Sequence, residues 1–300
     1  MKSSLLSRFN EYQKERFPFA VLTFTTLSVV LSSAAIVAQE GQTLSKLTLP
    51  IIVGTITCLL FMFNVRVFDD FKDKGFDDTF HGKRPVQRGL ISLKELNLIN
   101  YISIAFQVLL NIFISISAFF YWILAMIYSL IARAEFFMKD FIKKRFILYN
   151  ALNLLQMFFL QIYLYALIQP NFSFTNPLVF IHFIFVLANA VILEIARKLK
   201  SKDDESLGKD TYSGRYGIKT ASFIYAGSYF ITYILFLIIF LQIGYSFLIL
   251  LLSLVFLALI INSNIFYYVK RNKLSTKIIE GVAILFYLSM HLLILGAAFL

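Results

Sequence analysis

The sequence predicts an all-α integral membrane protein with nine transmembrane helices, and two observations indicate this class. Hydrophobic residues make up 59% of the 300 residues and charged residues only 15%, far from the composition of a soluble globular domain. The charges also gather in short clusters separated by long uncharged runs, as membrane topology requires. The net charge of +11 therefore indicates cytoplasmic loops and not a nucleic-acid-binding surface.

The uncharged runs divide into nine segments of about 20 residues, the length that a helix needs to cross the hydrocarbon core. Runs of 37, 48 and 50 uncharged residues are each too long for one span and long enough for two. Turn-forming residues break the second run at 169–177 and, more weakly, the third at 242–246. The predicted spans lie at 17–39 and 47–68, twice within 96–132, twice within 146–193, twice within 220–269, and from 276 onward.

The distribution of Lys and Arg predicts the orientation of these spans. With the N-terminus in the cytoplasm, 27 of the 28 basic residues lie on the cytoplasmic side and only Lys46 lies outside. The N-terminal segment has no cleavage site of small residues, which argues against a signal peptide. We expect one multi-pass membrane domain over residues 1–300, with an external C-terminus and cytoplasmic cap loops at about 69–94 and 197–219. In a bacterial cell this places it in the inner membrane.

The cytoplasmic end of the second predicted span carries a row of carboxylates. Asp70, Asp73 and Asp77 are spaced i, i+3, i+7 along one helix face, and Asp69 can replace Asp70 in an i, i+4, i+8 arrangement. Close carboxylates repel unless a cation neutralises them, and Mg²⁺ binds a few carboxylate oxygens together with water and substrate phosphate. These acids are therefore candidate Mg²⁺ ligands. In the alternative, they are solvated and pair with neighbouring cations: Lys72, Lys74 or Arg66.

Two arginines follow the acids in a constrained loop. Arg84 precedes a proline and Arg88 precedes a glycine, and the next helix begins with a predicted capping box from Ser92 to Glu95. Guanidinium groups bind phosphate oxygens in a bidentate manner. Acids that hold a metal and arginines that hold phosphate oxygens are together what a diphosphate leaving group requires.

The acids and arginines combine into one pattern, Asp69-Asp70-x-x-Asp73-x-x-x-Asp77 and then Arg84-Pro85-x-x-Arg88-Gly89-x-Ile91-Ser92. This pattern resembles the first aspartate-rich motif of the UbiA superfamily of intramembrane prenyltransferases, in which Asn usually stands at the position of Asp69. The predicted nine-span topology agrees with that family over the full length. The resemblance implies nine helices bundled around a lipid-facing central cavity, which the two cytoplasmic loops cap.

The second cap loop contains a less regular acidic cluster, where the family usually has Asp-x-x-x-Asp. Here Glu194 is followed at i+4 by Lys198. Glu194 is the predicted ligand, and through a folded loop it could act with one of three later acids: Asp203, Asp204 or Asp210. Otherwise Arg197 and Lys198 bind the diphosphate, or Glu194 only bridges Lys198. The segment that begins at Asp210 resembles the family's lead into the seventh helix, which makes Asp210 a candidate for the diphosphate site.

Four further polar residues lie within the spans or at their ends. Tyr128 and Arg133 are similar to a Tyr-x-x-x-Lys-Arg element of the family, with Ala132 in place of the Lys. Tyr128 could steady a carbocation and Arg133 could bind diphosphate, and the alternative is an interfacial Tyr beside a cytoplasmic Arg. His182 and His291 have no partners at metal-ligand spacing, so we expect both to hydrogen-bond between helices.

The resemblance implies Mg²⁺-dependent transfer of an isoprenyl group from an isoprenyl diphosphate to a small lipid-soluble acceptor, such as a quinone precursor, within the membrane lipids. The implied metal ligands are Asp70, Asp73, Asp77 and Glu194, and the implied diphosphate site comprises Arg84, Arg88, Arg133, Lys198, Asp210 and Tyr128. One alternative is a terpene cyclase of the same superfamily, in which the cation cyclises. The other is a membrane cation transporter, although transporters usually bind ions near the bilayer midplane and not at helix ends.

Overall fold

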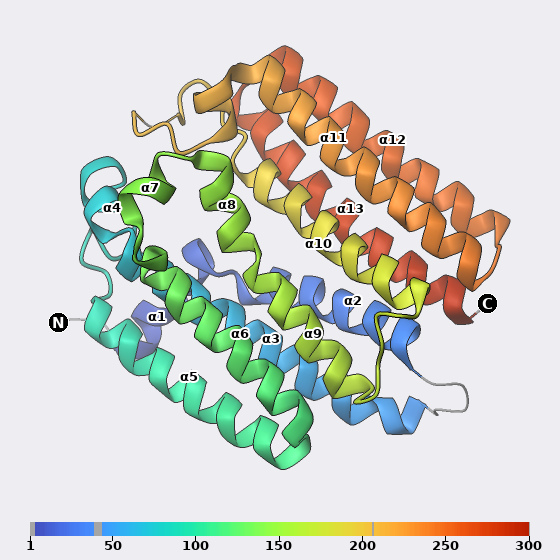
Figure 1. Cartoon of the computed structure of the whole chain (residues 1–300). Helices are drawn as coiled ribbons and strands as arrows, with labels where there is room; N and C mark the ends of the chain where they lie inside the picture. The colour runs from blue at the N-terminus through green and yellow to red at the C-terminus, as the bar shows by residue number, and fades with distance from the viewer. Residues whose placement is uncertain (1–3, 39–43, 206, 300) are drawn as a thin grey trace. The chain divides into compact units, whose positions relative to one another are not determined.

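The structure is a computed structural model that describes residues 4–38, 44–205 and 207–299. Every regular element in this part of the chain is a helix (Figure 1). The helices are α1 Leu5–Arg16, α2 Phe19–Val37, α3 Leu44–Lys72, α4 Lys74–Phe80, α5 Leu93–Ile114, α6 Ile116–Arg133, the 3-10 helix η1 Glu135–Phe137, α7 Lys139–Lys143, α8 Phe146–Leu154, α9 Gln156–Ile168, α10 Pro177–Arg197, α11 Tyr212–Ile243, α12 Phe247–Lys270 and α13 Lys273–Phe299.

The nine predicted spans are confirmed in the described part of the chain, which contains nine helical segments long and apolar enough to cross a membrane. Eight are single helices, namely α2, α3, α5, α6 and α10 to α13, and the fifth span runs through α8 and α9 from Phe146 to Ile168. The first span ends earlier than expected, at Val37, and its predicted end at Gln39 lies outside the described residues.

The breaks between paired spans follow from local chemistry. Ser115 separates α5 from α6, because its backbone is extended and its hydroxyl accepts a hydrogen bond from the Ala118 amide at 3.2 Å. Asn176 caps α10 in the same way, and Pro177 occupies the first helical turn. Gly244 ends α11 with a φ of 151°, a conformation that favours glycine. Both predicted breaks, 169–177 and 242–246, are therefore confirmed.

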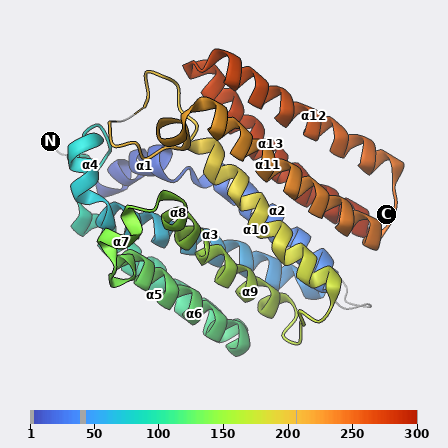
Figure 2. The same ribbon diagram turned by 45° about the horizontal axis from the view of Figure 1, so that its top comes forward.

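The chain divides into two compact units. Unit 1 contains residues 1–27 and 41–170, and unit 2 contains residues 28–40 and 171–300, so that the boundary falls within α2. In unit 2, α10 to α13 run side by side (Figure 2). In unit 1, α3 packs against α5, α6 and α9. The single domain over residues 1–300 and the central cavity both stay predictions.

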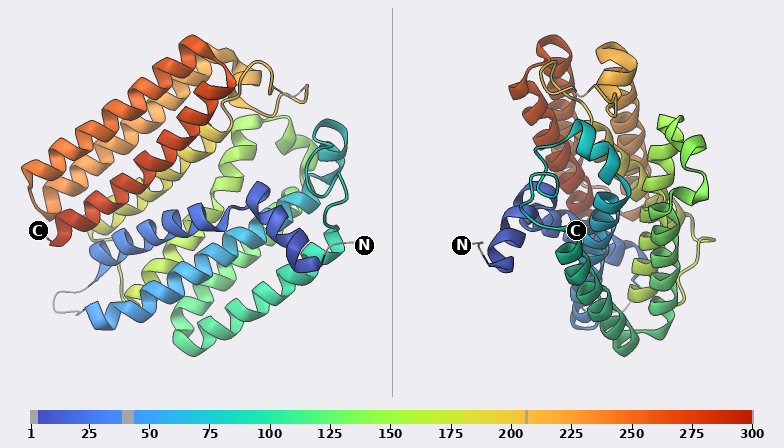
Figure 3. Two further views of the ribbon diagram at one scale, coloured as in Figure 1. Left: turned by 180° about the vertical axis from the view of Figure 1, so that it is seen from behind. Right: turned by 90° about the vertical axis from the view of Figure 1, so that its left-hand side faces the viewer.

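Helix α1 is an element that the sequence analysis did not predict. Ser4 caps its N-terminus, and Tyr12 and Phe17 pack into a buried apolar cluster with Phe63, Val67 and Ile91. This cluster attaches α1 to the C-terminal part of α3 and to the loop after α4. Figure 3 shows the dark blue α1 beside the teal α4 segment. A segment of mixed charge is thus part of the folded core of unit 1.

Side-chain amides hydrogen-bond between the spans of unit 1. Asn64 of α3 donates to Asn100 of α5 at 2.8 Å, and Gln107 of α5 donates to Asn64 at 2.7 Å. The indole of Trp122 on α6 donates to Gln107 at 3.0 Å. All four side chains are buried, so these bonds satisfy polar groups that neither lipid nor water can reach.

Candidate functional site

The first acidic cluster lies where α3 ends and α4 begins. Asp69 and Asp70 belong to the last turn of α3, Asp73 lies at the junction, and Asp77 belongs to α4. The Asp73 amide donates to the Asp69 carbonyl at 2.8 Å, and the Asp77 amide donates to the Asp73 carbonyl at 2.9 Å. Helical hydrogen bonding therefore continues through the junction, and Asp69, Asp73 and Asp77 follow one another at successive turns.

Asp70 is buried and its carboxylate is occupied on both oxygens. The hydroxyl of Tyr12 donates to Oδ2 at 2.6 Å, and the guanidinium groups of Arg16 and Arg66 each donate to Oδ1 at 2.7 Å. The two guanidinium groups thus neutralise the Asp70 carboxylate, and the Tyr12 hydroxyl satisfies its other oxygen. The Asp70 side chain is only 4% exposed. Ligation of a metal by Asp70 would require these bonds to break, which argues against the role that the i, i+3, i+7 spacing suggests.

Asp73 has weaker partners. Its Oδ1 accepts from the Tyr149 hydroxyl at 3.4 Å and lies 4.0 Å from Nζ of Lys143. Burial raises the pKa of Asp73, and the carboxylates of Asp69 and Asp77 raise it further. Asp69 and Asp77, one helical turn before and after Asp73, are therefore carboxylates that act on it. The electrostatics favour the i, i+4, i+8 alternative, with Asp69 in the row.

The cations nearest these acids come from several elements. Lys72 pairs with Asp69 at 2.7 Å, donates to Asn153 at 3.0 Å and lies 5.2 Å from the ring centroid of Tyr149. Lys143 of α7 also binds Glu135 at 2.7 Å. Sequence analysis did not identify Tyr149, Asn153 or Lys143, because each comes from a helix remote in sequence and none lies in a recognisable motif.

Three ion pairs involve the cations that the alternative to metal ligation named, in which neighbouring cations neutralise the acids. Lys72 binds Asp69, Arg66 binds Asp70, and Lys74 binds Asp78. The last of these pairs is exposed, and it lowers the pKa of Asp78 through the hydrogen bond from Lys74. Asp70, in contrast, is buried beneath α1 and not solvated.

The two predicted arginines separate into different surroundings. Arg84 donates to Asp77, so it lies directly at the acidic cluster. Arg88 binds two acids of α1, Glu15 at 2.6 Å and Glu11 at 3.1 Å, and its hydrogen bond lowers the pKa of Glu15. The capping box between Ser92 and Glu95, which begins α5 after this loop, is confirmed. Gly89 has a φ of 76°, which favours glycine in the turn after Arg88.

Tyr128 and Arg133 lie near the C-terminal end of α6. The Tyr128 hydroxyl donates to the Leu152 carbonyl at 2.8 Å, and its ring packs on Phe159 with a centroid distance of 4.8 Å. The guanidinium carbon of Arg133 lies 4.6 Å from the ring centroid of Phe71, on the last turn of α3. Arg133 is therefore held on α3 within unit 1, next to the residues that follow Asp70.

The second acidic cluster, in unit 2, begins at the end of α10. Glu194 binds Arg197 at 2.5 Å and Lys198 at 2.7 Å, and its side chain is 12% exposed. The ion pair between Glu194 and Lys198, which was the alternative to metal ligation, is thus present, and Arg197 is a second cation on the same carboxylate. Neither Asp203, Asp204 nor Asp210 has a hydrogen bond to Glu194 among the contacts of the described residues.

Glu205 is a residue of this loop that the sequence analysis passed over. Thr211 and Ser213 at the start of α11 donate to its carboxylate, and Arg271 at the end of α12 binds it at 3.1 Å. Asp204 accepts from Ser201 at 2.7 Å. The Glu205 carboxylate therefore ties the cap loop to two helices, and a Thr-x-Ser pair at a helix start was the available signal.

The two membrane-embedded histidines hydrogen-bond within unit 2, as expected. Nδ1 of His291 lies 2.8 Å from the Ser32 hydroxyl, and Nε2 of His182 lies 3.2 Å from the same oxygen. Both rings are fully buried, and Ser32 belongs to α2. The bonds therefore connect α2, α10 and α13.

The donor chemistry of the first cluster fits Mg²⁺. No group of three His, Cys, Asp or Glu side chains in the described residues is close enough together to form a ready metal cage. Mg²⁺ does not need such a cage, because it is usually held by one or two carboxylates while water and substrate phosphate complete its shell. Asp73 meets that need, since its contacts with Tyr149 and Lys143 are long, at 3.4 and 4.0 Å, and Asp69 and Asp77 lie one helical turn before and after it.

Comparisons with known proteins place the chain among membrane prenyltransferases. The UbiA prenyltransferase family model matches residues 22–298. Among solved structures, a digeranylgeranylglyceryl phosphate synthase is similar with 18% identity and a TM-score of 0.55, over 99% of each chain. A UbiA homologue from Archaeoglobus fulgidus bound to GPP and Mg²⁺ is similar with 18% identity and a TM-score of 0.53, over 94% of this chain and 99% of that chain.

The same homologue bound to DMAPP and Mg²⁺ is similar with 17% identity and a TM-score of 0.53, over 95% of this chain and 99% of that chain. At these identities the similarity establishes the fold. No curated protein sequence matches the chain significantly. The predicted family, fold class and enzyme class are confirmed by the family match and by these similar folds.

Proposed function

The chain belongs to the UbiA prenyltransferase family, and from this premise we propose that it transfers an isoprenyl group from an isoprenyl diphosphate to a lipid-soluble acceptor within the membrane. The observation that carries the proposal is the juxtaposition of Asp73 and Asp77 with the guanidinium of Arg84 at the end of a transmembrane helix. Similar folds that bind GPP or DMAPP together with Mg²⁺ support the same substrate class.

We propose that Asp69, Asp73 and Asp77 of unit 1 hold Mg²⁺, and that Glu194, at the end of α10 in unit 2, is also a metal ligand. Asp69 replaces Asp70 in this set, because Asp70 already binds Tyr12 and two arginines. When bound, Mg²⁺ would supply positive charge to a diphosphate leaving group. The diphosphate-binding residues that we propose are Arg84, Arg88, Arg133 and Tyr128 of unit 1, and Lys198 and Asp210 of unit 2.

The residues of this chain favour ionisation of an allylic diphosphate. The bond between carbon 1 and the diphosphate oxygen breaks, and the electron pair leaves with the diphosphate. Arg84 stabilises the charge that develops on those oxygens, because a preorganised guanidinium acts most strongly where water is excluded. The acceptor then forms a bond to carbon 1 and loses a proton to solvent. An apolar surrounding delays capture of the cation by water.

The proposed activity is tested with purified protein in lipid nanodiscs, a panel that includes GPP and DMAPP, Mg²⁺, and candidate acceptors such as quinone precursors. We expect release of diphosphate and a prenylated acceptor by mass spectrometry, with both lost in EDTA and restored by Mg²⁺. Diphosphate release with a cyclic hydrocarbon as the product would instead indicate a terpene cyclase. Absence of diphosphate release with every substrate would overturn the proposal and favour a function such as cation transport.

Substitution of Asp73 by Asn tests the metal ligands. The change preserves size and removes a charge, so we expect the apparent affinity for Mg²⁺ to fall about tenfold or more, equivalent to roughly 1.4 kcal/mol. The measurement is the Mg²⁺ dependence of diphosphate release. The matched control is Asp78→Asn, since Asp78 is exposed on α4 and pairs only with surface groups, Lys74 and Gln87. Equal Mg²⁺ dependence in the two variants would contradict the assignment of Asp73.

A further inference from the structure

One face of α1 contacts the loop that carries the candidate site. Tyr12 and Arg16 bind Asp70, Glu15 binds Arg88, and Arg8 forms a two-point ion pair with Glu95 at 2.6 and 2.9 Å. These α1 residues recur every three or four positions, so they share one side of the helix. Residues 8 to 16 of α1, a segment outside the membrane spans, are therefore bonded to residues between 70 and 95.

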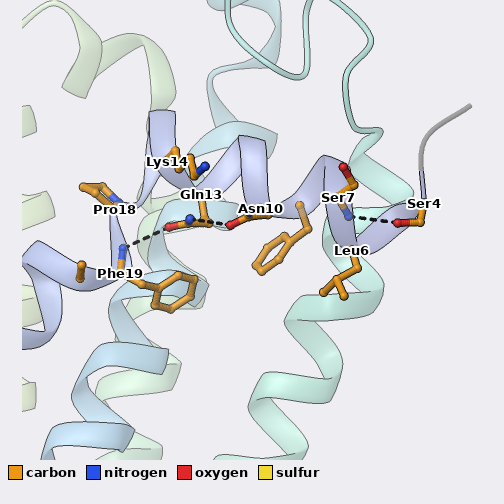
Figure 4. Close-up of a pocket in the computed structure, with 10 residues that line it drawn as sticks. Ser4, Leu6, Ser7, Asn10, Gln13, Lys14, Pro18 and Phe19 are labelled. Carbon is orange, nitrogen blue, oxygen red and sulfur yellow. Dashed lines mark hydrogen bonds between the residues drawn. The ribbon is translucent and has the colours of Figure 1, made fainter.

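The opposite face of α1 is open. A shallow pocket there is lined by Leu6, Asn10, Gln13 and Lys14, and none of the proposed site residues lines it (Figure 4). Gln13 fixes the turn into α2, because its side chain donates to Asn10 at 3.1 Å and accepts from the Phe19 amide at 3.3 Å. This turn sets the direction from which α1 reaches the end of α3.

The bonds to Asp70 determine how the end of α3 is rotated. Asp69 precedes Asp70 by one residue, which corresponds to about 100° around a helix. Tyr12 is fully buried and Arg16 is largely buried, so their bonds to Asp70 are shielded from water. With Asp70 anchored to α1, Asp69 is directed to another side, where its carboxylate pairs with Lys72 at 2.7 Å and its carbonyl accepts from the Asp73 amide at 2.8 Å.

We propose that Tyr12 and Arg16 are positioning residues for the metal and diphosphate site. By holding Asp70, they fix the rotation of the last turn of α3, so that Asp69 and Asp73 face the same substrate groups. In this proposal Tyr12, Arg16 and Asp70 do not touch the substrate. This inference rests on the proposed function, because it assigns a role in assembling the same site.

The test compares Tyr12→Phe, Arg16→Gln and Asp70→Asn, singly and combined, in two measurements. One is binding of Mn²⁺, as a probe for Mg²⁺, followed by electron paramagnetic resonance on the full-length protein in nanodiscs. The other is the Mg²⁺ dependence of diphosphate release. We expect each α1 variant to weaken Mn²⁺ binding roughly fivefold or more, while the rate at saturating Mg²⁺ changes by less than about twofold.

The combined variants separate positioning from ligation. If Asp70 acts through α1, then Asp70→Asn weakens Mn²⁺ binding as much as the Tyr12→Phe/Arg16→Gln double variant, and adding it to that variant has no further effect. A far larger loss in Asp70→Asn alone would overturn the inference and make Asp70 a ligand. Arg16→Lys, which retains the charge, is expected to restore part of the binding. Lys14→Gln, on the open face of α1, is the matched control and should bind Mn²⁺ as the wild type does.

Two outcomes separate this inference from the proposed function. Wild-type protein that binds Mn²⁺ but releases no diphosphate from any substrate contradicts the proposed function, and the Mn²⁺ measurement still decides the role of α1. An active wild type whose α1 variants bind Mn²⁺ normally contradicts the positioning role alone. Thermal unfolding of each variant identifies any that fail to fold. If the other variants do not fold, Arg16→Lys decides the inference. Mn²⁺ binding weaker than in the wild type supports it, and binding equal to the wild type overturns it.

Discussion

At the residue scale, the contacts of Glu194 are compatible with two alternative roles, a metal ligand or a partner of neighbouring cations. It lies at the end of a transmembrane helix, is mostly buried, and binds both Arg197 and Lys198 of its own helix. Two cations on one carboxylate leave net positive charge, which suits a diphosphate. The same contacts, however, also occur in a helix end with no catalytic function, so substitution has to separate the two roles.

Glu194→Gln and Glu194→Asp make that separation. If Glu194 is a ligand, removal of its charge should abolish turnover, whereas the shorter Asp should retain part of it. If Glu194 only bridges Arg197 and Lys198, it does not touch the substrate, and both substitutions should leave the rate nearly unchanged. Initial rates of diphosphate release measure the difference. An active Glu194→Gln enzyme would direct attention to the later acids: Asp203, Asp204 and Asp210.

At the scale of one element, α11 contains a strained glycine near its start. Gly217 has φ 77° and ψ 164°, a conformation that residues with a side chain rarely adopt, so the helix is kinked there. The segment before the kink includes Ser213, which donates to Glu205 and accepts from the Lys200 amide at 2.8 Å. The kink therefore allows the first turn of α11 to bind the cap loop while the rest of the helix crosses the membrane.

Gly217→Ala should destabilise this arrangement. We expect a loss of about 1–3 kcal/mol in the free energy of unfolding, because Cβ makes the observed backbone conformation unfavourable. The apparent unfolding temperature in detergent is the measurement. Gly227→Ala is the matched control, since Gly227 lies in the same helix and has open space where a Cβ would be. The non-helical backbone within α11 is confined to Gly217, so the backbone at Gly227 is helical. That variant should be neutral or slightly more stable, and equal destabilisation of both would contradict the strain at Gly217.

At the scale of the whole molecule, the asymmetry of Lys and Arg predicts which ends of the spans face the cytoplasm. The chain suits a labelling test, because its single cysteine, Cys58, is buried. Residues 173 and 203 lie before and after α10, at its two ends, and both are exposed.

Ser173→Cys should therefore react with an impermeant thiol reagent from outside the cell, and Asp203→Cys only from the cytoplasmic side. Accessibility is measured in intact cells and in inverted vesicles. The unmodified protein serves as the control for labelling of Cys58. Reaction of both introduced cysteines from the same side would contradict the orientation and the odd number of spans.

Hydropathy, charge and turn-forming residues in the sequence by themselves determined the nine spans, the breaks at 169–177 and 242–246, and the candidate acids, because each depends on neighbours within a few residues. Only the tertiary structure decided which of these acids is available. Tyr12 and Arg16 reach Asp70 from 58 and 54 residues away, and Tyr149 reaches Asp73 from 76 residues away. A carboxylate binds whichever cation the packing brings to it. Spacing alone therefore treated Asp69 and Asp70 as interchangeable, while the position of α1 distinguishes them.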